Sequence, residues 1–485
     1  FSPNEDLNLK LIASAYSAVE SETYDIQGQY WIGLLETNPG SEEQGDVIAN
    51  QGVGTYIEHA RNAFYSRVVN LDHKGAYKYR DNVLKWGLRY QHQLFDDIIN
   101  EWDMTDSAGY TQPHVIDSIL NPNNPMQTPL ELKNVANGHN ILYVNNLDGY
   151  LQNSWQFENE KGNIWVLTAG LRANYWGYAG SVNVSPRAGI AYQPHKHPNM
   201  TFRLSGGVYV QPPFYRELRM FDGTLVSKDK ASVQKSYQVV LGHEYKFQAW
   251  NRPFILTTEL YYKYLKDIIP YEVDNIRIRY YADQKATGYA TGLDIKINGE
   301  FVKGIESWAS MSIMKTAENI QYFIDANGGI LSQTQVNNGA EYVRDTIISG
   351  IPRPSDQRIN FAIFFQDYLP LIPSFKVNLK LIFGTGLPFG PSESERYQQK
   401  NRMTPYRRVD LGFSKQLIGD ATSFRNPRNP LNYIRNCWLS LEVFNLLGVN
   451  NVSSYMWVTD IYNIQYAVPN YLTNRQLNLK LIVEF

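Results

Sequence analysis

The chain ends on the stretch RQLNLKLIVEF, Arg475–Phe485, and the pattern of this stretch decides the fold. Every second residue is apolar: Leu477, Leu479, Leu481, Val483 and Phe485. The residues between them are polar, apart from Ile482: Gln476, Asn478, Lys480 and Glu484. Because successive side chains of a strand point to opposite faces, the stretch is predicted to be a strand with one apolar and one polar face. The strand stops at an aromatic residue, which favours lipid over a protein core beside the apolar face.

Strands of this two-faced kind recur along the whole chain, with no helices between them to cover a sheet. They are predicted near residues 7–16, 63–79, 83–99, 141–158, 165–175, 185–192, 201–210, 232–247, 254–269, 277–297, 308–315, 359–365, 375–383, 409–414, 439–443 and 477–485. About sixteen strands is an even number, as in single-chain bacterial outer-membrane barrels, and strands of ten residues or more can cross a bilayer when tilted. The predicted fold class is therefore all-β, a transmembrane antiparallel β-barrel.

The composition supports the same class. The 485 residues carry a net charge of −2, so no basic excess exists to bind nucleic acid. Aromatic residues make up 14%, with 35 tyrosines, while the mean hydropathy is only −0.40. This pairing suits a barrel whose lipid band arises from alternation and is flanked by aromatic girdles. The single cysteine, Cys437, excludes an internal disulfide. We also expect no metal site, no cofactor and no enzymatic activity, because no nucleophile motif or acid/base pair stands out.

Glycine, proline and polar residues gather in four ranges that interrupt the strands. Long extracellular loops are predicted near residues 36–54, 103–137, 319–354 and 446–468, with short turns at the opposite ends of the strands. Outer-membrane barrels show this asymmetry between long outer loops and short inner turns. The opening residues are neither a signal peptide nor a helix start, so we expect the chain to begin partway through a longer precursor.

Five motifs and the last residue resemble TonB-dependent receptors. The motifs are Ser185–Arg187 (SPR), Gly207–Leu218 (GVYVQPPFYREL), Gly288–Ile297 (GYATGLDIKI), Tyr406–Leu417 (YRRVDLGFSKQL) and Phe444–Asn451 (FNLLGVNN). Phe485 fits the terminal signal that the barrel-assembly machinery reads in that family. The resemblance implies that residues 1–485 are the C-terminal portion of a 22-stranded barrel, with the plug and the first strands outside this sequence. It also implies the outer membrane as location, with outer-membrane lipid, the plug domain of the same precursor and the TonB complex as partners.

Charged residues on the polar faces of the predicted strands are candidates for contacts with the plug. They are Arg172, Arg187, Arg358, Arg408, Asp410 and Glu442. On a lipid-facing surface, arginine or lysine would cost roughly 2–4 kcal/mol at the midplane, so these side chains must face a lumen. The alternative is that they form ion pairs with one another along the wall.

A second set of residues is expected at the outer mouth. Pro212 and Pro213 cannot donate hydrogen bonds to a ladder, so the strand before them should end there. The residues that follow combine aromatic rings with guanidinium groups, which suit a sugar, a chelate or a peptide: Phe214, Tyr215, Arg216 and Arg219. Trp457, Asp460 and Tyr462 lie in the last predicted outer loop and are further candidates. Packing within the loops is the alternative for both groups.

Three functions remain open from the sequence. The resemblance implies energised import of a scarce nutrient, such as a chelate, an oligosaccharide or a peptide, with a SusD-like surface lipoprotein as a further partner. A passive sixteen-stranded porin is the second hypothesis, and direct pairing of the first and last strands would favour it. The third is a receptor-like scaffold that binds surface lipoproteins or a secretion assembly.

Overall fold

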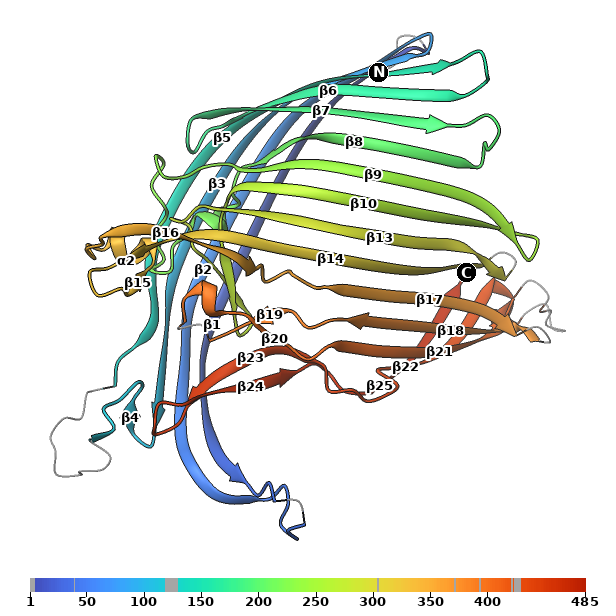
Figure 1. Ribbon diagram of the computed structural model, residues 1–485. Coiled ribbons are helices and arrows are strands. Elements are labelled where there is room, and N and C mark those ends of the chain that lie inside the picture. Colours follow the sequence, from blue (N-terminus) through green and yellow to red (C-terminus); the bar gives the residue numbers. More distant parts are fainter. Residues whose placement is uncertain are drawn as a thin grey trace.

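The computed structural model describes residues 5–38, 40–117, 130–302, 305–369, 372–391, 394–419, 422 and 429–485. Its main feature is one antiparallel sheet of nineteen strands, curved into an open trough (Figure 1). None of the helices in the described residues has the length and apolar character that crossing a membrane requires. The prediction of an all-β fold built on a large antiparallel sheet is confirmed.

The elements of the first part of the chain are β1 (Leu7–Leu35), β2 (Val47–Tyr79), β3 (Asn82–Ser107), β4 (Tyr110–Thr111), β5 (Lys133–Glu158), β6 (Ile164–Trp176), β7 (Ser181–Gln193), β8 (Met200–Gln211), η1 (Tyr215–Leu218), β9 (Gln234–Ala249), β10 (Arg252–Ile268), β11 (Tyr271–Asp274) and β12 (Arg277–Tyr280). Those of the second part are β13 (Ala286–Val302), β14 (Ile305–Ile324), β15 (Ile330–Leu331), α2 (Gln333–Asn337), β16 (Arg344–Pro352), β17 (Ile359–Leu369), β18 (Ile372–Gly384), β19 (Pro388–Phe389), η2 (Arg396–Gln398), β20 (Asn401–Arg402), β21 (Tyr406–Ile418), η3 (Pro430–Tyr433), β22 (Asn436–Phe444), β23 (Val452–Thr459), β24 (Gln465–Tyr471) and β25 (Gln476–Glu484).

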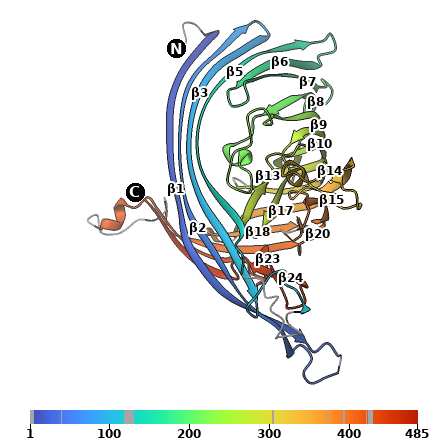
Figure 2. The same ribbon diagram turned by 90° about the vertical axis from the view of Figure 1, so that its left-hand side faces the viewer.

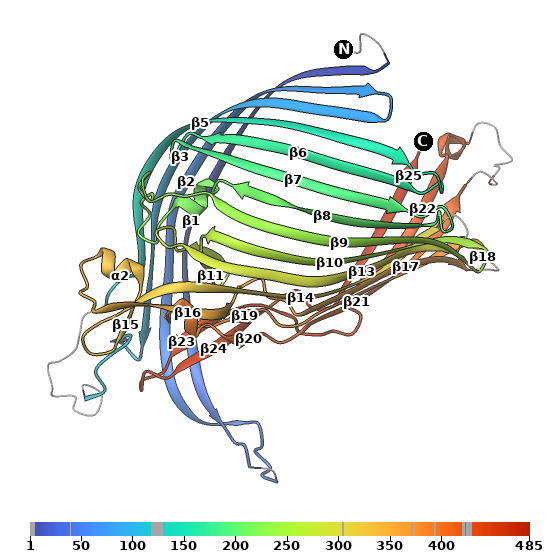
Figure 3. The same ribbon diagram turned by 45° about the horizontal axis from the view of Figure 1, so that its top comes forward.

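Sixteen strands form a meander in which each strand pairs with the next: β1, β2, β3, β5, β6, β7, β8, β9, β10, β13, β14, β17, β18, β21, β22 and β25. The short β4 and β15 are appended to it, and β16 continues the edge of β17 along the far half of β14. Within the described residues β1 pairs only with β2 and β25 only with β22, so the sheet is not closed. Figure 3 shows the open trough from above.

The two ends of the strands differ. At one end most connections are short: residues 80–81 join β2 to β3, and residues 250–251 join β9 to β10, whereas residues 419–435 between β21 and β22 form a longer connection. Leu7 and Glu484 both lie at this short-turn end. At the other end, the long-loop end, the chain folds into smaller elements between the strands. Here β1, β2, β3 and β5 extend well beyond the rest of the sheet (Figure 2).

The ranges predicted to be long loops contain regular structure. Residues 47–54 belong to β2, so the first connection is only residues 36–46. Residues 103–107 and 133–137 belong to β3 and β5, while residues 118–129 lie outside the described part. The range 319–354 holds the end of β14 together with β15, α2 and β16, and the range 446–468 holds β23 and part of β24.

The prediction of one strand over residues 277–297 is wrong. The chain makes a turn in which the Gln284 amide donates to the Tyr281 carbonyl, so β12 and β13 are separate strands. β12 pairs with β11 as a small hairpin, whereas β13 joins the main sheet between β10 and β14. This hairpin folds away from the wall and becomes part of the site described below.

Because directly paired residues point to the same side of the sheet, the strand register places apolar residues on one continuous face across all sixteen strands. Leu11 is 75% exposed on β1, and Leu477, Leu479 and Leu481 are 73%, 69% and 60% exposed on β25. Partner positions on the strands between are also apolar, and include Leu71, Leu88, Leu151, Leu171, Leu204, Leu241, Leu260, Leu293, Ile313, Phe361, Leu381, Leu411 and Leu441. In the part of the chain that the structure describes, no protein layer covers this apolar face, as expected for a surface in contact with lipid.

The opposite, polar face is equally continuous. Cross-strand partners on it include Asp72, Arg89, Asp148, Arg172, Arg187, Arg203, Glu244, Glu259, Lys296, Lys380, Asp410, Glu442 and Lys480. Buried residues gather where loops pack on this face at the long-loop end. One cluster joins the β8–β9 loop to β5 and β6, a second lies among β10, β13, β14 and β16, and a third joins β1 to β23.

Candidate functional site

A cavity of about 620 Å³ lies on the polar face at the long-loop end, and we call it the mouth cavity. Its outer wall consists of the far halves of β1, β2 and β3, with the start of β5. Three inward-folded segments face this wall: the β8–β9 loop with η1, the β11–β12 hairpin and the β23–β24 hairpin. Figure 2 shows the loop that carries η1 inside the curve of the blue and cyan strands.

The β8–β9 loop is anchored to the wall by Tyr215. β8 ends at Gln211, immediately before the two prolines, as predicted. The Tyr215 ring lies 5.5 Å from the ring of Phe64 and 5.0 Å from that of Phe95, and its hydroxyl donates to Asp97 Oδ2 at 2.9 Å. Burial, followed by the nearby Asp97 charge, raises the pKa of Tyr215 far above its ordinary value, so it remains a donor.

Two arginines of the same loop reach the wall. The Arg216 guanidinium donates to Glu20 on β1 at 2.8 Å, and that of Arg219 lies 3.4 Å from Asp97 on β3. Both arginines line the mouth cavity. Both ion pairs span the cavity from loop to wall, so they set its width at this side.

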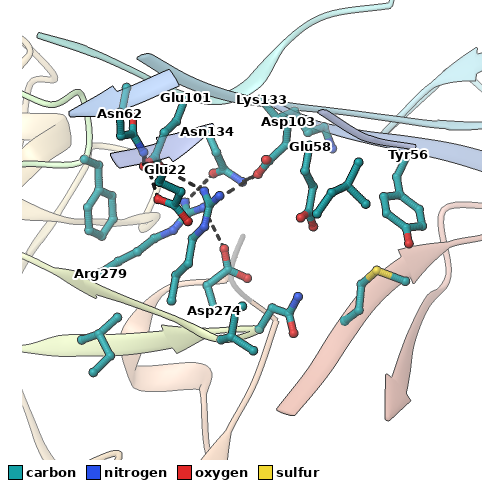
Figure 4. A pocket seen from close by; sticks show the side chains of 18 of the residues that line it. Glu22, Tyr56, Glu58, Asn62, Glu101, Asp103, Lys133, Asn134, Asp274 and Arg279 are labelled. Carbon is teal, nitrogen blue, oxygen red and sulfur yellow. Dashed lines mark hydrogen bonds and ion pairs between the residues drawn. The ribbon is translucent and has the colours of Figure 1, made fainter. Parts of the chain in front are cut away.

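The β11–β12 hairpin contributes two more arginines. The Arg277 guanidinium donates to Glu101 Oε2 at 3.0 Å, and Asn62 bridges Glu101 to Glu22 at 2.5 and 3.1 Å. The Arg279 guanidinium contacts Asp274 at 2.8 Å and donates to Asn134 Oδ1 at 2.6 Å. Figure 4 shows these side chains meeting between β1–β3 and the hairpin.

Aromatic rings line the remaining surface of the mouth cavity. Tyr56 stands on β2 directly opposite Gly28, where a methyl group would overlap the tyrosine ring, so this glycine makes room for it. The Arg277 guanidinium lies 5.8 Å from the centre of the Tyr24 ring. Trp457 of β23 stacks on Phe389 with ring centres 5.9 Å apart. Rings and charged groups therefore line one partly open space.

Buried ion pairs behind the β11–β12 hairpin fix its position. Arg396 of η2 is 1% exposed; it contacts Glu318 on β14 at 3.2 Å and donates to the carbonyls of Tyr271 and Pro352. Gln399 donates to Glu272 at 2.6 Å. The β18–β21 loop, the hairpin and the main sheet are therefore linked through one guanidinium group and one amide.

The residues predicted at the outer mouth divide into two groups. Tyr215, Arg216, Arg219 and Trp457 all line the mouth cavity. Phe214 is 66% exposed and is not among the lining residues. Asp460 is 1% exposed and holds the tip of the β23–β24 hairpin, because its carboxylate accepts from the amides of Tyr462 and Ile464 at 2.8 and 2.9 Å.

Five of the six residues predicted to face a plug belong to the polar face by strand register, and the sixth, Arg358, immediately precedes β17. Arg172 contacts Asp148 at 3.0 Å, Arg358 contacts Asp356 at 2.9 Å, and Arg408 contacts Asp410 at 2.7 Å. The Arg187 guanidinium lies 4.3 Å from the Tyr209 ring centre, and Glu442 accepts from Asn478 at 3.0 Å. Five of the six, all but Arg187, therefore take part in ion pairs or hydrogen bonds within the wall.

The sequence-based prediction missed most of the carboxylates in the mouth cavity. Glu20, Glu22, Glu58 and Asp103 stand on β1, β2 and β3. One signal was available: Glu20 and Glu22 have the same parity as the polar residues of the first predicted strand, so alternation continued past residue 16 would have placed them on the polar face. Asp103 fell within a predicted loop and escaped that reasoning.

Comparisons with known proteins agree with this architecture. A sequence model described as "TonB dependent receptor-like, beta-barrel" matches residues 4–452. No curated protein matches the chain in sequence. Among solved structures, the outer membrane transporter YddB from Escherichia coli is similar with a TM-score of 0.52 at 11% identity, over 99% of this chain and 67% of that one. The copper transporter OprC gives a TM-score of 0.50 at 10% identity, over 99% and 70%.

The structure of the FpvAI–pyocin S2 complex gives a TM-score of 0.51 at 10% identity, over 99% of this chain and 64% of that one. The chain thus spans about two thirds of the length of these structures. Identities this low show a shared fold, while the family match covers most of the sequence. By that match the chain belongs to the family of TonB-dependent receptor β-barrels, which are proteins of the outer membrane.

Proposed function

We propose that this chain forms the wall and the outer mouth of an importer that takes up a scarce nutrient, a chelate, an oligosaccharide or a peptide, with energy delivered by TonB. The observation that carries the proposal is the unbroken division of sixteen strands into an apolar and a polar face, with the mouth cavity on the polar face. An apolar exterior and a polar interior are what a barrel in lipid requires.

The membership of the family and the neighbouring folds support import over other roles. YddB is described as an outer membrane transporter and OprC as a copper transporter. In the proposed mechanism, a substrate enters the mouth cavity from outside, and TonB then pulls on the plug domain to open a path through the barrel. The chain itself performs no covalent chemistry: it orients the substrate and holds the plug.

The polar face is the proposed seat of the plug. The candidate contacts lie on β6, β7, β21 and β22 and immediately before β17, so together they could contact a domain that fills the trough: Arg172, Arg187, Arg358, Arg408, Asp410 and Glu442. A SusD-like lipoprotein would instead cover the long-loop end. Recovery of such a lipoprotein in equal amount with the receptor from native membranes tests that part of the proposal.

The passive porin is not favoured by the observed sheet. Direct pairing of the first and last strands would support it, but β1 and β25 do not pair in the described residues. β1 and β25 therefore each have one edge of backbone N–H and C=O groups with no partner strand in the described residues, and in hydrocarbon no water can form hydrogen bonds with these groups. An open sheet of these sixteen strands is therefore an unfavourable structure for a passive pore in a bilayer.

Uptake by intact cells tests the proposed function. The gene for the full-length receptor is deleted, and uptake of labelled iron chelates, cobalamin, oligosaccharides and peptides is compared in strains with and without TonB. We expect uptake of one nutrient class to require both the receptor and TonB. Uptake through the purified receptor into liposomes with no energy source, at the same rate as in cells, would overturn the proposal.

A further inference from the structure

The charged side chains of the mouth cavity come from two sides. Carboxylates dominate the wall strands, where Glu20, Glu22, Glu58, Asp97, Glu101 and Asp103 line the cavity together with one cation, Lys133, at the start of β5. Arginines dominate the inward-folded segments, which contribute Arg216, Arg219, Arg277 and Arg279 together with one carboxylate, Asp274. The sign of the charge left for a ligand depends on which of these groups already have partners.

Every arginine of the mouth cavity is already paired. Arg216 contacts Glu20, Arg219 contacts Asp97, Arg277 contacts Glu101 and Arg279 contacts Asp274, at 2.8, 3.4, 3.0 and 2.8 Å. An anionic ligand would therefore have to break an existing ion pair to gain a guanidinium group. Such an exchange leaves a displaced carboxylate in the cavity and brings little net gain.

Glu58 differs from the paired arginines because its carboxylate has no partner of opposite charge among the described residues. It is half-buried, lines the mouth cavity and makes no hydrogen bond or ion pair with any residue in the described part of the chain. Its direct cross-strand partner is Asp103, and like charges in directly opposed positions destabilise a sheet. Figure 4 shows its carboxylate pointing into the same space as Asp103 and Asp274, with no contact drawn to it.

One lysine, Lys133, also lines the cavity and is the cross-strand partner of Asp103 on β5, but within the described residues no hydrogen bond or ion pair joins it to Glu58. Asp103 accepts from Asn134 at 2.9 Å, and Arg279 lies 3.9 Å away from it because that guanidinium contacts Asp274 at 2.8 Å. Burial, then the charges of Asp103 and Asp274, raise the pKa of Glu58. Glu58 lies about twenty residues from the short-turn end of β2, whereas about ten residues cross a bilayer, so the group stands outside the membrane.

We propose that the mouth cavity binds a ligand through an alkyl ammonium or guanidinium group, which lies between Glu58 and Asp103. Such a group would donate to both carboxylates and relieve their repulsion without breaking any of the four arginine pairs. The Tyr56 ring lines the cavity from the same strand as Glu58 and offers an aromatic face beside the cation. This inference rests on the proposed function, and it narrows the substrate to basic compounds, whether peptides or polyamines.

Binding to the purified, full-length receptor tests the inference. Trilysine, N-acetylated triglutamate, N-acetylated trialanine and spermidine are titrated at low ionic strength, with intrinsic tryptophan fluorescence or calorimetry as the readout. We expect trilysine to bind and triglutamate and trialanine to bind at least about tenfold more weakly, because the unpaired charge is negative. Spermidine binding as tightly as trilysine would assign the site to amines in general; much weaker spermidine binding would assign it to basic peptides.

Matched variants identify the carboxylates. Glu58→Gln and Asp103→Asn should each weaken trilysine binding by about tenfold or more, since each removes a charged acceptor. Asp148→Asn is the control, because Asp148 is a carboxylate of the same polar face that lies away from the cavity and contacts Arg172. Heat-modifiable migration on gels confirms that each variant is folded. Equal or tighter binding of triglutamate, or unchanged binding of trilysine by folded Glu58→Gln and Asp103→Asn, would overturn the inference.

The outcome is separable from that of the uptake experiment. Binding is measured without TonB, so trilysine binding that depends on Glu58, in a receptor that imports nothing, would refute the proposed import and leave the ligand class intact. Conversely, TonB-dependent uptake of an anionic chelate, together with no trilysine binding, would support import and overturn the inference on the ligand class.

Discussion

Glu58 on β2 and Asp103 on β3 are directly opposed partners on the polar face of the sheet, and both line the mouth cavity. Two carboxylates in this relation oppose folding, because each raises the electrostatic cost of ionising the other. The wall of the cavity is therefore less stable than an uncharged wall of the same shape would be. A binding site that is strained in this way gains stability when its ligand arrives.

Glu58→Gln should stabilise the receptor. The substitution removes the repulsion with Asp103, a gain of about 0.2–1 kcal/mol in the free energy of unfolding. Urea unfolding in detergent micelles measures it. Glu20→Gln is the control, since Glu20 contacts Arg216 and its loss should bring no gain. Because the pKa of Glu58 is raised in the folded state, its ionisation opposes folding, and the advantage of the variant should vanish as the pH falls through that pKa.

Leu479→Arg and Asn478→Arg test which face meets lipid. Leu479 is 69% exposed on the apolar face of β25, so an arginine there should cost about 2–4 kcal/mol near the bilayer midplane and reduce assembly in the outer membrane. Asn478 points to the polar face beside Glu442, with which an arginine can pair. Quantitative blotting of heat-modifiable receptor in outer-membrane fractions compares them. Equal loss of both variants would argue against an apolar exterior.

Arg396→Met should release the β11–β12 hairpin from the sheet. The change leaves Glu318, which is fully buried, with only Arg353 at 3.6 Å, and breaking a buried ion pair in this way costs about 3–5 kcal/mol. Limited proteolysis within the hairpin and the β18–β21 loop detects the release. Arg358→Met is the matched control, because that arginine is partly exposed. The double variant Arg396→Met, Glu318→Met should recover much of the loss, since it removes both charges.

Asp460→Ala should loosen the tip of the β23–β24 hairpin. The carboxylate accepts from the amides of Tyr462 and Ile464 and from the Tyr466 hydroxyl, so its removal takes away hydrogen bonds of a part-buried turn, worth about 0.5–1.5 kcal/mol each. Hydrogen exchange at Tyr462 and Ile464 measures the change. Trilysine binding should remain within about twofold, because Asp460 does not line the mouth cavity. A large loss of binding with no change in exchange would show that Asp460 contacts the ligand itself.

Alternation alone predicted much of the fold. Side chains alternate between the two faces along any strand, so Leu477, Leu479 and Leu481 could be assigned to one surface without knowing any partner strand. The strand at residues 277–297 failed because alternation does not reveal where a strand leaves the sheet. The turn at Tyr281–Gln284 depends on contacts with Pro270, which lies outside that segment.

The mouth cavity was less accessible to sequence reasoning. Two of its four arginines, Arg216 and Arg219, were found because they stand next to prolines and aromatic rings, whereas Arg277 and Arg279 were missed. Glu58 and Asp103 meet only through the register of β2 and β3, and that register follows from the turn at residues 80–81, more than twenty residues away from either. Whether two distant carboxylates such as Glu58 and Asp103 meet depends on strand length and strand pairing, and no local sequence motif indicates it.

The single guanidinium group of Arg396 ties the β18–β21 loop to the β11–β12 hairpin and to the main sheet, and this has an evolutionary consequence. A receptor whose outer segments are anchored separately can vary each of them alone as its environment changes. Here an insertion or charge change in the β18–β21 loop disturbs the hairpin that shapes the mouth cavity. Variation among descendants should therefore appear as coordinated replacements in both segments, so that recognition of a new nutrient requires several simultaneous changes.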